Sequence, residues 1–285
     1  FSRQAYLSPE YVAAVRQAAD AAHIMVFSHP WIYPLVKDQL RPNQVVIYES
    51  HHVEGFLRAQ LLSDSNSTER EILEGVIKDE LECGRRANWI LTCSHEDLLR
   101  FNRLYGFSPQ KMRVVPNGVM AFANPMANEA SRLKAREVLG ISKDDFIGIF
   151  IGSPYGPNID AAQFINKSLS PACPDTTFVI AGGVGAQMTS AGSNVMMTGP
   201  LDDVARDRWY AAADFAINPM MAGSGTNIKM FDFMAASLPI LTTDIGARGI
   251  DAGSDFMRIV PAEVESFSAA IASLRESPEK RASMG

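Results

Sequence analysis

The chain has 285 residues, of which 47% are hydrophobic and 20% charged, an ordinary balance for a globular protein with room for two domains. Its net charge of −6 argues against broad, non-specific nucleic-acid binding, which needs a basic face. No apolar run approaches the roughly twenty residues of a membrane helix, and the opening FSRQAYLSPEY lacks the features of a signal peptide. Three scattered cysteines form neither a disulfide framework nor a metal-binding spacing, so we expect a cytoplasmic protein.

The first part of the chain alternates short apolar strands with amphipathic helices, which is typical of parallel α/β sheets. We expect strands at His23–Ser28, Val45–Glu49, Trp89–Cys93 and Met112–Val115. We expect helices at Pro9–Ala22, from about Val53 to Arg86, and at His95–Leu104, the last capped by Ser94 and ended by Gly106.

The amino-acid composition changes at Ala121–Ala130. This segment is rich in small residues, Asn and Pro, which predicts a linker. A second series of strands is expected at Phe146–Ile151, Thr177–Ala181, Val195–Thr198, Phe215–Ile217 and Ile240–Thr242. Its helices are expected at Ser131–Leu139, Ile159–Leu169, Asp203–Ala212, Asn227–Ala236 and Val264–Arg275. We therefore predict two doubly wound α/β domains, residues 1–122 and 123–285, with ligands at the carboxyl ends of strands, facing a cleft.

The stretch FAINPMMAGSGTNIKMFDFMAASLPILTTDIGARG, residues 215–249, predicts a strand, a glycine loop, a helix and a strand in turn. Gly223 and Gly225 let the backbone approach a ligand, and the following helix presents unpaired amides and a positive dipole end to an anion. Lys229 and Asp232 share one face of this helix. Lys229 precedes Asp232, and a lysine near the start of a helix is disfavoured by the helix dipole. A bound anion would offset this penalty, so a phosphate site is favoured over the alternative, a surface ion pair.

This stretch resembles the donor site of family 4 glycosyltransferases, in which a GSGT-x-x-K loop precedes an acidic residue and a P-[IV]-[VIL]-x-T segment. The family's E-x7-E pair falls on Ser224 and Asp232, so serine stands in place of the first glutamate. The resemblance implies that Asp232 binds the ribose hydroxyls of the nucleotide. SPYGPNIDAAQF resembles the first loop of the family's C-terminal domain. Gly152, Ser153 and Asn158 stand where many members carry an Arg and a Lys.

The segment VVIYESHHVEGFLR places Glu49, His51, His52 and Glu54 at the end of a predicted strand, where ligand sites of parallel sheets lie. It resembles the family's D/E-x-H-[ND]-x-E segment, which faces the donor sugar, with His51 on the family's histidine. Histidines that only bond backbone or cap a helix are the open alternative, whereas adjacent histidines without a third spaced ligand disfavour zinc. His29 either lines the acceptor side or is a buried, satisfied histidine.

Two groups of charged residues are interpreted as solvated surface. Glu80 and Glu82 with Arg85 and Arg86 predict helix-surface charge. A modest basic cluster comprises Arg100, Arg103, Lys111 and Arg113, for which contact with anionic lipid headgroups is the alternative.

The resemblance runs from about Ala18 to Arg275 and implies a GT-B fold of two Rossmann-like domains, the N-terminal one incomplete because strands expected before Pro9 are missing. It implies a metal-independent, hexosyltransferase-like enzyme of glycan biosynthesis that retains anomeric configuration and closes about a hinge at Gly118–Pro125. The substrates would be a UDP- or GDP-linked sugar and a glycan or lipid-linked acceptor, without a cofactor. The location would be cytoplasmic, with peripheral contact at the inner face of the membrane.

The resemblance implies two sets of site residues. The implied catalytic residues are His51, Glu54 and Ser224. The implied donor-binding residues are Gly152, Ser153, Asn158, Gly223, Gly225, Thr226, Asn227, Lys229 and Asp232. Two alternatives stay open: a non-catalytic binding or scaffold module of the same fold, and a nucleotide-sugar epimerase in which Glu49, His51 and Glu54 perform acid–base work.

Overall fold

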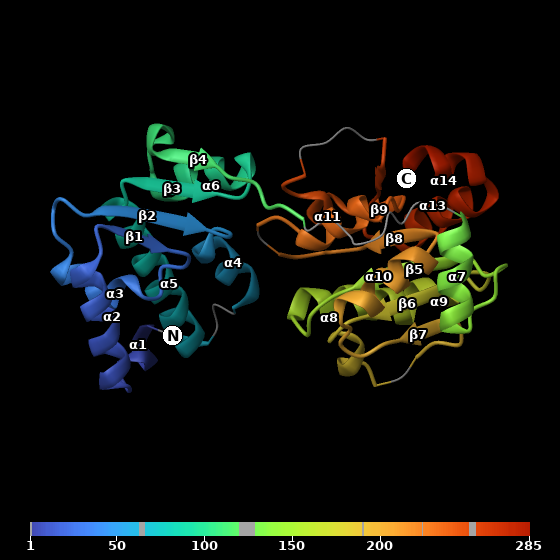
Figure 1. Ribbon diagram of the computed structural model, residues 1–285, viewed down its shortest axis with the longest axis horizontal. Coiled ribbons are helices and arrows are strands. Elements are labelled where there is room, and N and C mark those ends of the chain that lie inside the picture. The colour runs from blue at the N-terminus through green and yellow to red at the C-terminus, as the bar shows by residue number, and fades with distance from the viewer. Residues whose placement is uncertain (1, 63–65, 120–128, 190, 224, 251–254) are drawn as a thin grey trace. The chain divides into compact units, whose positions relative to one another are not determined.

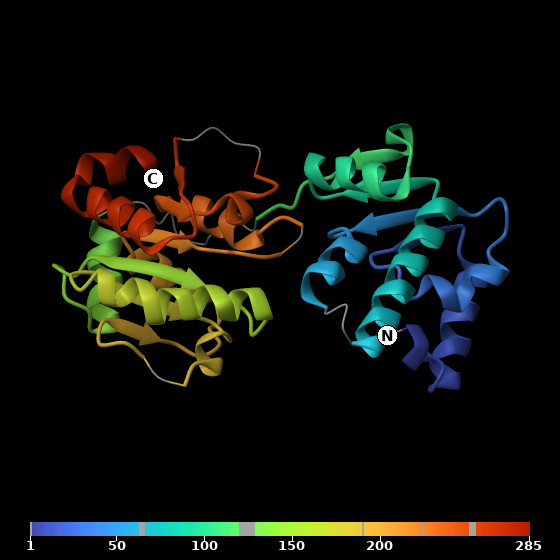
Figure 2. The ribbon, with the colours of Figure 1, turned by 180° about the vertical axis from the view of Figure 1, so that it is seen from behind.

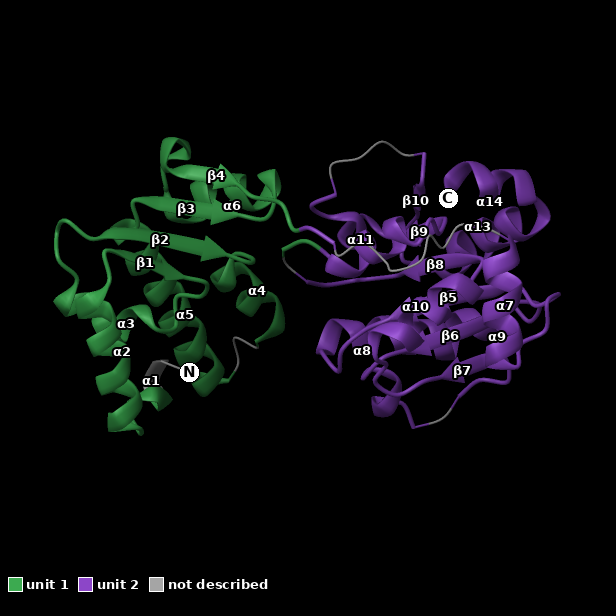
Figure 3. Cartoon of the chain, in the orientation of Figure 1, with its two compact units in different colours: residues 1–117, 224–226 green, residues 118–223, 227–285 purple. Residues whose placement is uncertain are grey.

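The computed structural model describes residues 2–62, 66–119, 129–189, 191–223, 225–250 and 255–285 (Figure 1). The chain forms two compact units, one of residues 1–117 with 224–226 and the other of residues 118–223 with 227–285 (Figure 3). The predicted boundary at 122/123 and most of the predicted linker and hinge lie outside the described residues.

The first unit contains a sheet of four parallel strands in the order β1-β2-β3-β4. These are β1 (Ile24–Phe27), β2 (Val45–Ser50), β3 (Trp89–Thr92) and β4 (Met112–Val114). Ile24 lies opposite Val45, and Ile47 lies opposite Trp89, so the carboxyl ends of β1 and β2 meet at one edge of the sheet. Parallel neighbours need a crossover, and helices fill each crossover between these strands.

The helical segments of the first unit are α1 (Ser2–Ala5), α2 (Pro9–Ala21), α3 (Tyr33–Val36), η1 (Lys37–Gln39), α4 (Glu54–Leu61), α5 (Ser67–Arg86), α6 (His95–Tyr105) and η2 (Pro109–Lys111). Ser94 caps α6 by accepting from the Asp97 amide, and Gly106 ends it with a φ of 68°, both as predicted. Figure 2 shows α5 crossing one face of the sheet.

The single helix predicted from about Val53 to Arg86 is wrong, because the segment forms the two helices α4 and α5. Leu62 leaves the helical region with φ −103° and ψ 149°. A new helix then starts at Asn66, whose side chain accepts from the amides of Thr68 and Glu69. Asn66 and Ser67 favour helix starts over helix interiors, and this local chemistry overrides the continuing helical pattern.

The predicted solvated basic cluster is wrong for two of its members. The side chain of Arg100 is 16% exposed and pairs with Glu96 at 2.5 Å and Asp97 at 3.0 Å. Lys111 donates to the carbonyl of Gly84 at 2.6 Å, at the negatively polarised carboxyl end of α5. Arg100 is therefore paired within α6 and Lys111 with the end of α5, so neither belongs to a free basic surface.

The second unit contains six parallel strands in the order β10-β9-β8-β5-β6-β7. They are β5 (Ile147–Ile151), β6 (Thr177–Ala181), β7 (Val195–Met197), β8 (Phe215–Asn218), β9 (Ile240–Thr242) and β10 (Met257–Ile259). Counted from the first strand of the unit, this is the doubly wound order 6-5-4-1-2-3. The direction of winding changes between the neighbours β5 and β8, and ligands of such sheets bind outside the carboxyl ends of these two strands.

The helices of this unit cover both faces of its sheet (Figures 1 and 2). They are α7 (Glu129–Leu139), α8 (Gly156–Gln163), the π-helical η3 (Phe164–Leu169), α9 (Ser170–Ala172), η4 (Gly185–Gln187), α10 (Asp203–Ala212), α11 (Ile228–Ala235), α12 (Asp244–Ala247), α13 (Val264–Glu276) and α14 (Pro278–Met284). Phe150, Phe178 and Phe215 pack on one face, and Ile149, Val179 and Phe233 on the other. Burying each of these side chains contributes about 1.5–3 kcal/mol.

The predicted fold class, an α/β chain with two parallel Rossmann-like sheets, is confirmed. Strand β10 and the short helices α12 and α14 were not predicted. Across the residues with described structure, no helix combines the length and the apolar character that crossing a bilayer demands.

Candidate functional site

Two helices start at the switch point of the second sheet, α8 after β5 and α11 after β8. Neither Tyr155, which precedes α8, nor Asn227, which precedes α11, caps its helix with a side-chain hydrogen bond. Neither helix has an acidic residue in its first turn. The first amides of both helices, and the positive ends of their dipoles, are therefore suited to an anion at this edge.

Lys229 connects these two helix starts. Its Nζ donates to Oδ1 of Asn158 at 2.7 Å and lies 4.3 Å from the centroid of the Phe150 ring. Asn158 in turn donates from Nδ2 to the carbonyl and the hydroxyl of Ser153, at 3.2 Å and 3.3 Å. Ser153, Asn158 and Lys229, three of the predicted donor-binding residues, thus form one hydrogen-bonded chain.

The electrostatic setting of Lys229 is unusual for a lysine. Burial lowers its pKa to about 7, because the ammonium loses hydration. Among the described residues no carboxylate pairs with it, so the alternative of an ion pair with Asp232 is wrong. A half-buried cation without a carboxylate partner favours an anionic ligand at this place.

Asp232 lies one turn after Lys229 on α11 and faces α10. Burial raises its pKa, an effect that the nearby charge of Arg206 partly offsets. Arg206 itself pairs with Asp203 and Asp207, each at 2.8 Å. The carboxylate is thus fixed beside α10 as a hydrogen-bond acceptor, which is the chemistry that binding a pair of ribose hydroxyls needs.

The loop before α11 depends on its glycines. Gly223 and Gly225 have φ values of 139° and 72°, which side-chain-bearing residues rarely adopt. Nη1 of Arg248 donates to the Gly223 carbonyl at 2.6 Å, a contact that sequence reasoning missed. The signal was the GARG segment that follows β9, because the ends of β8 and β9 are neighbours in a parallel sheet.

The remaining predicted donor residues have defined surroundings, whereas Ser224, which was predicted to be catalytic, lies outside the described residues. Asn227 donates from Nδ2 to the Gly246 carbonyl at 3.1 Å and so ties α11 to α12. Oγ1 of Thr226 is buried and has no hydrogen-bond partner within the described structure. Gly152 is tied into the sheet through its amide, and a Cβ there would lie 3.0 Å from Cγ of Asn158.

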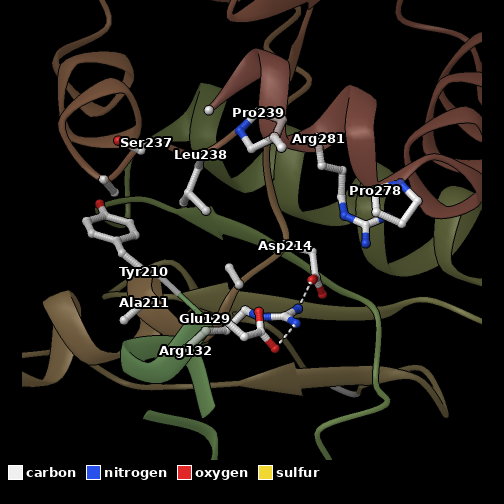
Figure 4. Close-up of a pocket in the computed structure, with 14 residues that line it drawn as sticks. Glu129, Arg132, Tyr210, Ala211, Asp214, Ser237, Leu238, Pro239, Pro278 and Arg281 are labelled. Atoms are coloured by element: carbon white, nitrogen blue, oxygen red, sulfur yellow. Dashed lines mark hydrogen bonds and ion pairs between the residues drawn. The ribbon is translucent and has the colours of Figure 1, made fainter. Parts of the chain in front are cut away.

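A cavity of about 400 Å³ lies at the opposite edge of this sheet (Figure 4). Asp214, which precedes β8, accepts there from Arg132 at 2.5 Å, and also from Arg136 at 2.7 Å and the Ile147 amide at 2.7 Å. The guanidinium of Arg132 points at Asp214, as Figure 4 shows. The charges around Asp214 compensate one another and serve the fold, and none of the predicted donor residues lines this cavity.

In the first unit, four titratable residues gather where β1 and β2 end. His29 follows β1, His51 and His52 follow β2, and Glu54 starts α4. The side chain of Glu54 is 2% exposed, and its Oε1 accepts from Nδ1 of His29 and Nε2 of His52, each at 3.0 Å. Burial raises the pKa of Glu54, but the hydrogen bond from His52 and the charge of Arg58 outweigh it, so the net shift is downward.

The rings at this edge are stacked. His51 is exposed and lies 5.0 Å from His29, between ring centroids, at an interplanar angle of 23°. His29 satisfies a buried carboxylate, yet its own side chain is 42% exposed, so it combines features of both interpretations made from the sequence. No group of three His, Cys, Asp or Glu side chains that could hold a metal ion occurs among the described residues.

The start of α4 is fixed by Glu80, whose predicted place on the helix surface is wrong because it is 0% exposed. Its carboxylate accepts from the hydroxyls of Tyr48 at 2.8 Å and Tyr105 at 2.5 Å, and from the amides of Glu54 at 2.8 Å and Gly55 at 2.9 Å. A carboxylate at the positive end of a helix is stabilised by its dipole. Glu80 therefore positions Glu54.

A chain of two Rossmann-like units is the composition of the GT-B fold, and solved structures of this fold are similar to the chain. Sucrose-phosphate synthase from Thermosynechococcus elongatus is 16% identical, with a TM-score of 0.74 over 99% of this chain and 72% of that one. HepE from Anabaena, solved with UDP and glucose, is 18% identical, with a TM-score of 0.71 over 99% and 75%. WaaG, a glycosyltransferase involved in lipopolysaccharide biosynthesis, is 18% identical, with a TM-score of 0.61 over 88% and 73%.

Within this fold, residues 145–277, a little under half of the chain, match the family described as glycosyl transferases group 1. The match covers the second unit from β5 to α13 and includes Lys229, Asn158 and Asp232. It supports the glycosyltransferase class that the sequence predicts for this part of the chain. No curated protein has a significantly similar sequence.

Proposed function

We propose that the chain is a glycosyltransferase that moves a sugar from a nucleotide-diphosphate donor to a hydroxyl-bearing acceptor. The observation that carries the proposal is Lys229, a half-buried cation without a carboxylate partner among the described residues, bonded to Asn158 between two helix starts that lack a side-chain cap. It lies at the switch point of the unit that matches glycosyl transferases group 1. The diphosphate of the donor is the anion that these groups suit.

The division of roles follows from the chemistry of each residue. Lys229 and the first amides of α8 and α11 stabilise the charge that develops on the diphosphate as the glycosidic bond breaks. Asp232 accepts hydrogen bonds from the ribose hydroxyls, and the loop of Gly223 and Gly225 brings backbone amides to the phosphates. Because lysine and helix dipoles supply the positive charge, we propose that transfer needs no metal ion.

The finer features come from the family resemblance. We propose a UDP- or GDP-linked hexose as donor, since HepE was solved with UDP and glucose. We further propose a glycan or lipid-linked acceptor, retention of anomeric configuration and a cytoplasmic location. His51 contacts the donor sugar in this proposal, as the family's histidine does.

An assay of donor turnover tests the proposal. The full chain is incubated with UDP-glucose or GDP-mannose in the presence and absence of simple glycoside acceptors, and released UDP or GDP is measured. Release of one nucleotide, faster with an acceptor, supports a transferase. Conversion of the donor sugar with its nucleotide still attached would instead establish an epimerase, and a nucleotide that binds without any turnover would establish a scaffold.

The affinity for nucleotide should depend on pH because Lys229 titrates near neutrality. Only the protonated ammonium attracts the diphosphate, and the pKa of Lys229 in the free protein is about 7. The affinity for UDP or GDP is therefore expected to fall by up to about tenfold per pH unit above pH 7. Calorimetric titration between pH 7 and pH 9 measures this slope. Lys229→Arg, which stays charged, should flatten it, and a flat wild-type profile would contradict the role of Lys229.

A further inference from the structure

The cavity of about 400 Å³ in Figure 4 lies wholly within the second unit and holds none of the residues predicted to bind the donor. Helices α7, α10 and α14 border it, together with the loop between α11 and β9. Leu238, Pro239 and Pro278 give it an apolar wall, beside a few charged and hydroxyl-bearing side chains. This volume and this mixture of groups are typical of sites for small molecules.

Arg281 is the cation of this cavity that has no acidic partner. Its Nη1 donates to the backbone carbonyls of Leu274 and Arg275 in the last turn of α13, at 3.1 Å for Arg275. Its guanidinium carbon lies 5.3 Å from the centroid of the Phe146 ring. Carbonyls and a ring fix the side chain and leave its charge without a carboxylate in the part of the chain that the structure describes. A planar guanidinium in this state suits a phosphate or carboxylate ligand.

The two carboxylates that line the cavity are bound to a different arginine. Arg132 donates from Nη1 to Asp214 at 2.5 Å and from Nη2 to Glu129 at 2.8 Å. Figure 4 shows these contacts as dashed lines. The negative charge of the cavity is therefore already paired, which leaves the charge of Arg281 available to a ligand.

Ser237 brings a hydroxyl into the cavity at a backbone position that favours glycine. Its φ is 53°, and it is the one residue other than glycine with a positive φ among those described. Its amide donates to the Met234 carbonyl at 3.0 Å and so closes the end of α11, a role that glycine fills without strain. Strained residues of this kind often serve binding rather than folding. Figure 4 shows Leu238 and Pro239 between Ser237 and Arg281, so the hydroxyl and the guanidinium lie at separate parts of the cavity.

We propose that this cavity binds a small organic anion that carries hydroxyl groups, such as a sugar phosphate or a sugar acid. Arg281 binds the phosphate or carboxylate, Ser237 exchanges a hydrogen bond with a hydroxyl, and the sugar lies on Leu238 and Pro239. The site is distinct from the donor site, because it lies at the amino-terminal edge of the sheet whereas Lys229 lies at the carboxyl edge. The inference does not depend on the proposed function.

Calorimetric titration of the full chain with glucose 6-phosphate, glucuronate and inorganic phosphate tests the proposal. At least one of the two sugar anions is expected to bind more tightly than inorganic phosphate, because only they reach both Arg281 and Ser237. Which of the two binds distinguishes a phosphate ligand from a carboxylate ligand. Arg281→Gln should weaken that binding about tenfold or more, and Ser237→Gly about twofold to tenfold. Ser237→Gly should also melt at an equal or higher temperature, since glycine relieves the strain at φ 53°.

Two further variants are the controls. Arg275→Gln removes the same charge from α13, but Arg275 pairs with Asp175 at 2.7 Å and does not line the cavity. It should bind the sugar anion as wild type does. Lys229→Met removes the cation of the donor site and leaves the cavity intact, so it should also keep wild-type affinity for the sugar anion.

The possible outcomes separate the two sites. Binding of neither sugar anion, inorganic phosphate bound as tightly as both, or full affinity in Ser237→Gly would overturn the proposal. An equal loss in Arg275→Gln would reduce it to unspecific charge attraction, and a loss confined to Lys229→Met would assign the anion to the donor site. If Arg281→Gln does not fold, Ser237→Gly decides alone. A chain that binds a sugar anion here but neither UDP nor GDP would overturn the proposed function and leave this site standing.

Discussion

Replacing Glu80 with alanine is expected to lower the free energy of unfolding of the first unit by about 3–5 kcal/mol. The change removes the shared acceptor of the Tyr48 and Tyr105 hydroxyls and of the amides of Glu54 and Gly55. Each buried donor left without an acceptor costs about 1–3 kcal/mol. Urea denaturation followed by the fluorescence of the first unit's tryptophans, Trp31 and Trp89, measures the loss.

Glu82→Ala is the matched control in the same helix. Glu82 pairs with Lys37 at 2.9 Å, but both side chains are about one third exposed. A pair of this kind contributes about 0–1 kcal/mol, so this variant should unfold close to wild type. Equal losses in the two variants would contradict the buried role of Glu80.

Replacing Lys229 with methionine is expected to weaken the binding of UDP or GDP by about 2–4 kcal/mol, roughly 30- to 1000-fold, without loss of stability. The pKa of Lys229 is about 7 in the folded chain and takes its ordinary value of 10.5 in the unfolded chain. The folded chain therefore binds this proton less tightly than the unfolded chain. The charged side chain therefore opposes folding at neutral pH, and its removal should leave the melting temperature equal or higher.

Lys167→Met supplies the comparison, because Lys167 is exposed on η3 of the same unit. Calorimetry should show wild-type affinity in this variant, and thermal unfolding should show unchanged stability. If Lys229→Met lost stability and kept its nucleotide affinity, Lys229 would be a structural residue rather than a ligand-binding one.

The strands of the second unit were predictable because both of their faces are buried. Segments such as Ile147–Ile151 and Thr177–Ala181 are continuous apolar runs, and burial on two faces removes any alternation. Strand β10 lies at the sheet edge and has only Met257 buried among its three residues, so its sequence carries little strand signal. Short helices such as α12 fall below the length at which helical periodicity is visible.

Glu80 illustrates what local sequence cannot supply. Its neighbours are polar and charged, which is typical of a solvated helix face. Its partners Tyr48 and Tyr105 lie 32 and 25 positions away in the sequence, so the burial of its carboxylate depends on tertiary packing. Acidic residues are usually exposed, which is why the sequence predicts surface charge at this position. Glu80 is an exception because four hydrogen bonds compensate the burial of its carboxylate.

The meeting of the loops at the candidate site of the second unit was predictable, because the order of elements in a doubly wound sheet dictates which loops meet. Ser153, Asn158 and Lys229 come from the loops and helices after β5 and β8, and the structure links them in one chain. The pairing of His29 with Glu54 was not predicted, although both follow neighbouring strands. The order of the strands places both residues at the same sheet edge. The contact between Nδ1 of His29 and the Glu54 carboxylate depends on tertiary packing, which the sequence pattern does not specify.

Calorimetric titration of the full chain with UDP and GDP in EDTA, beside Asp232→Ala, tests the donor site most directly. We predict that the wild-type chain binds one of the two nucleotides without metal and that Asp232→Ala weakens this binding at least about tenfold, about 1.4 kcal/mol. Wild-type binding of neither nucleotide, or full affinity in Asp232→Ala, would contradict the donor site at the β5 and β8 switch point.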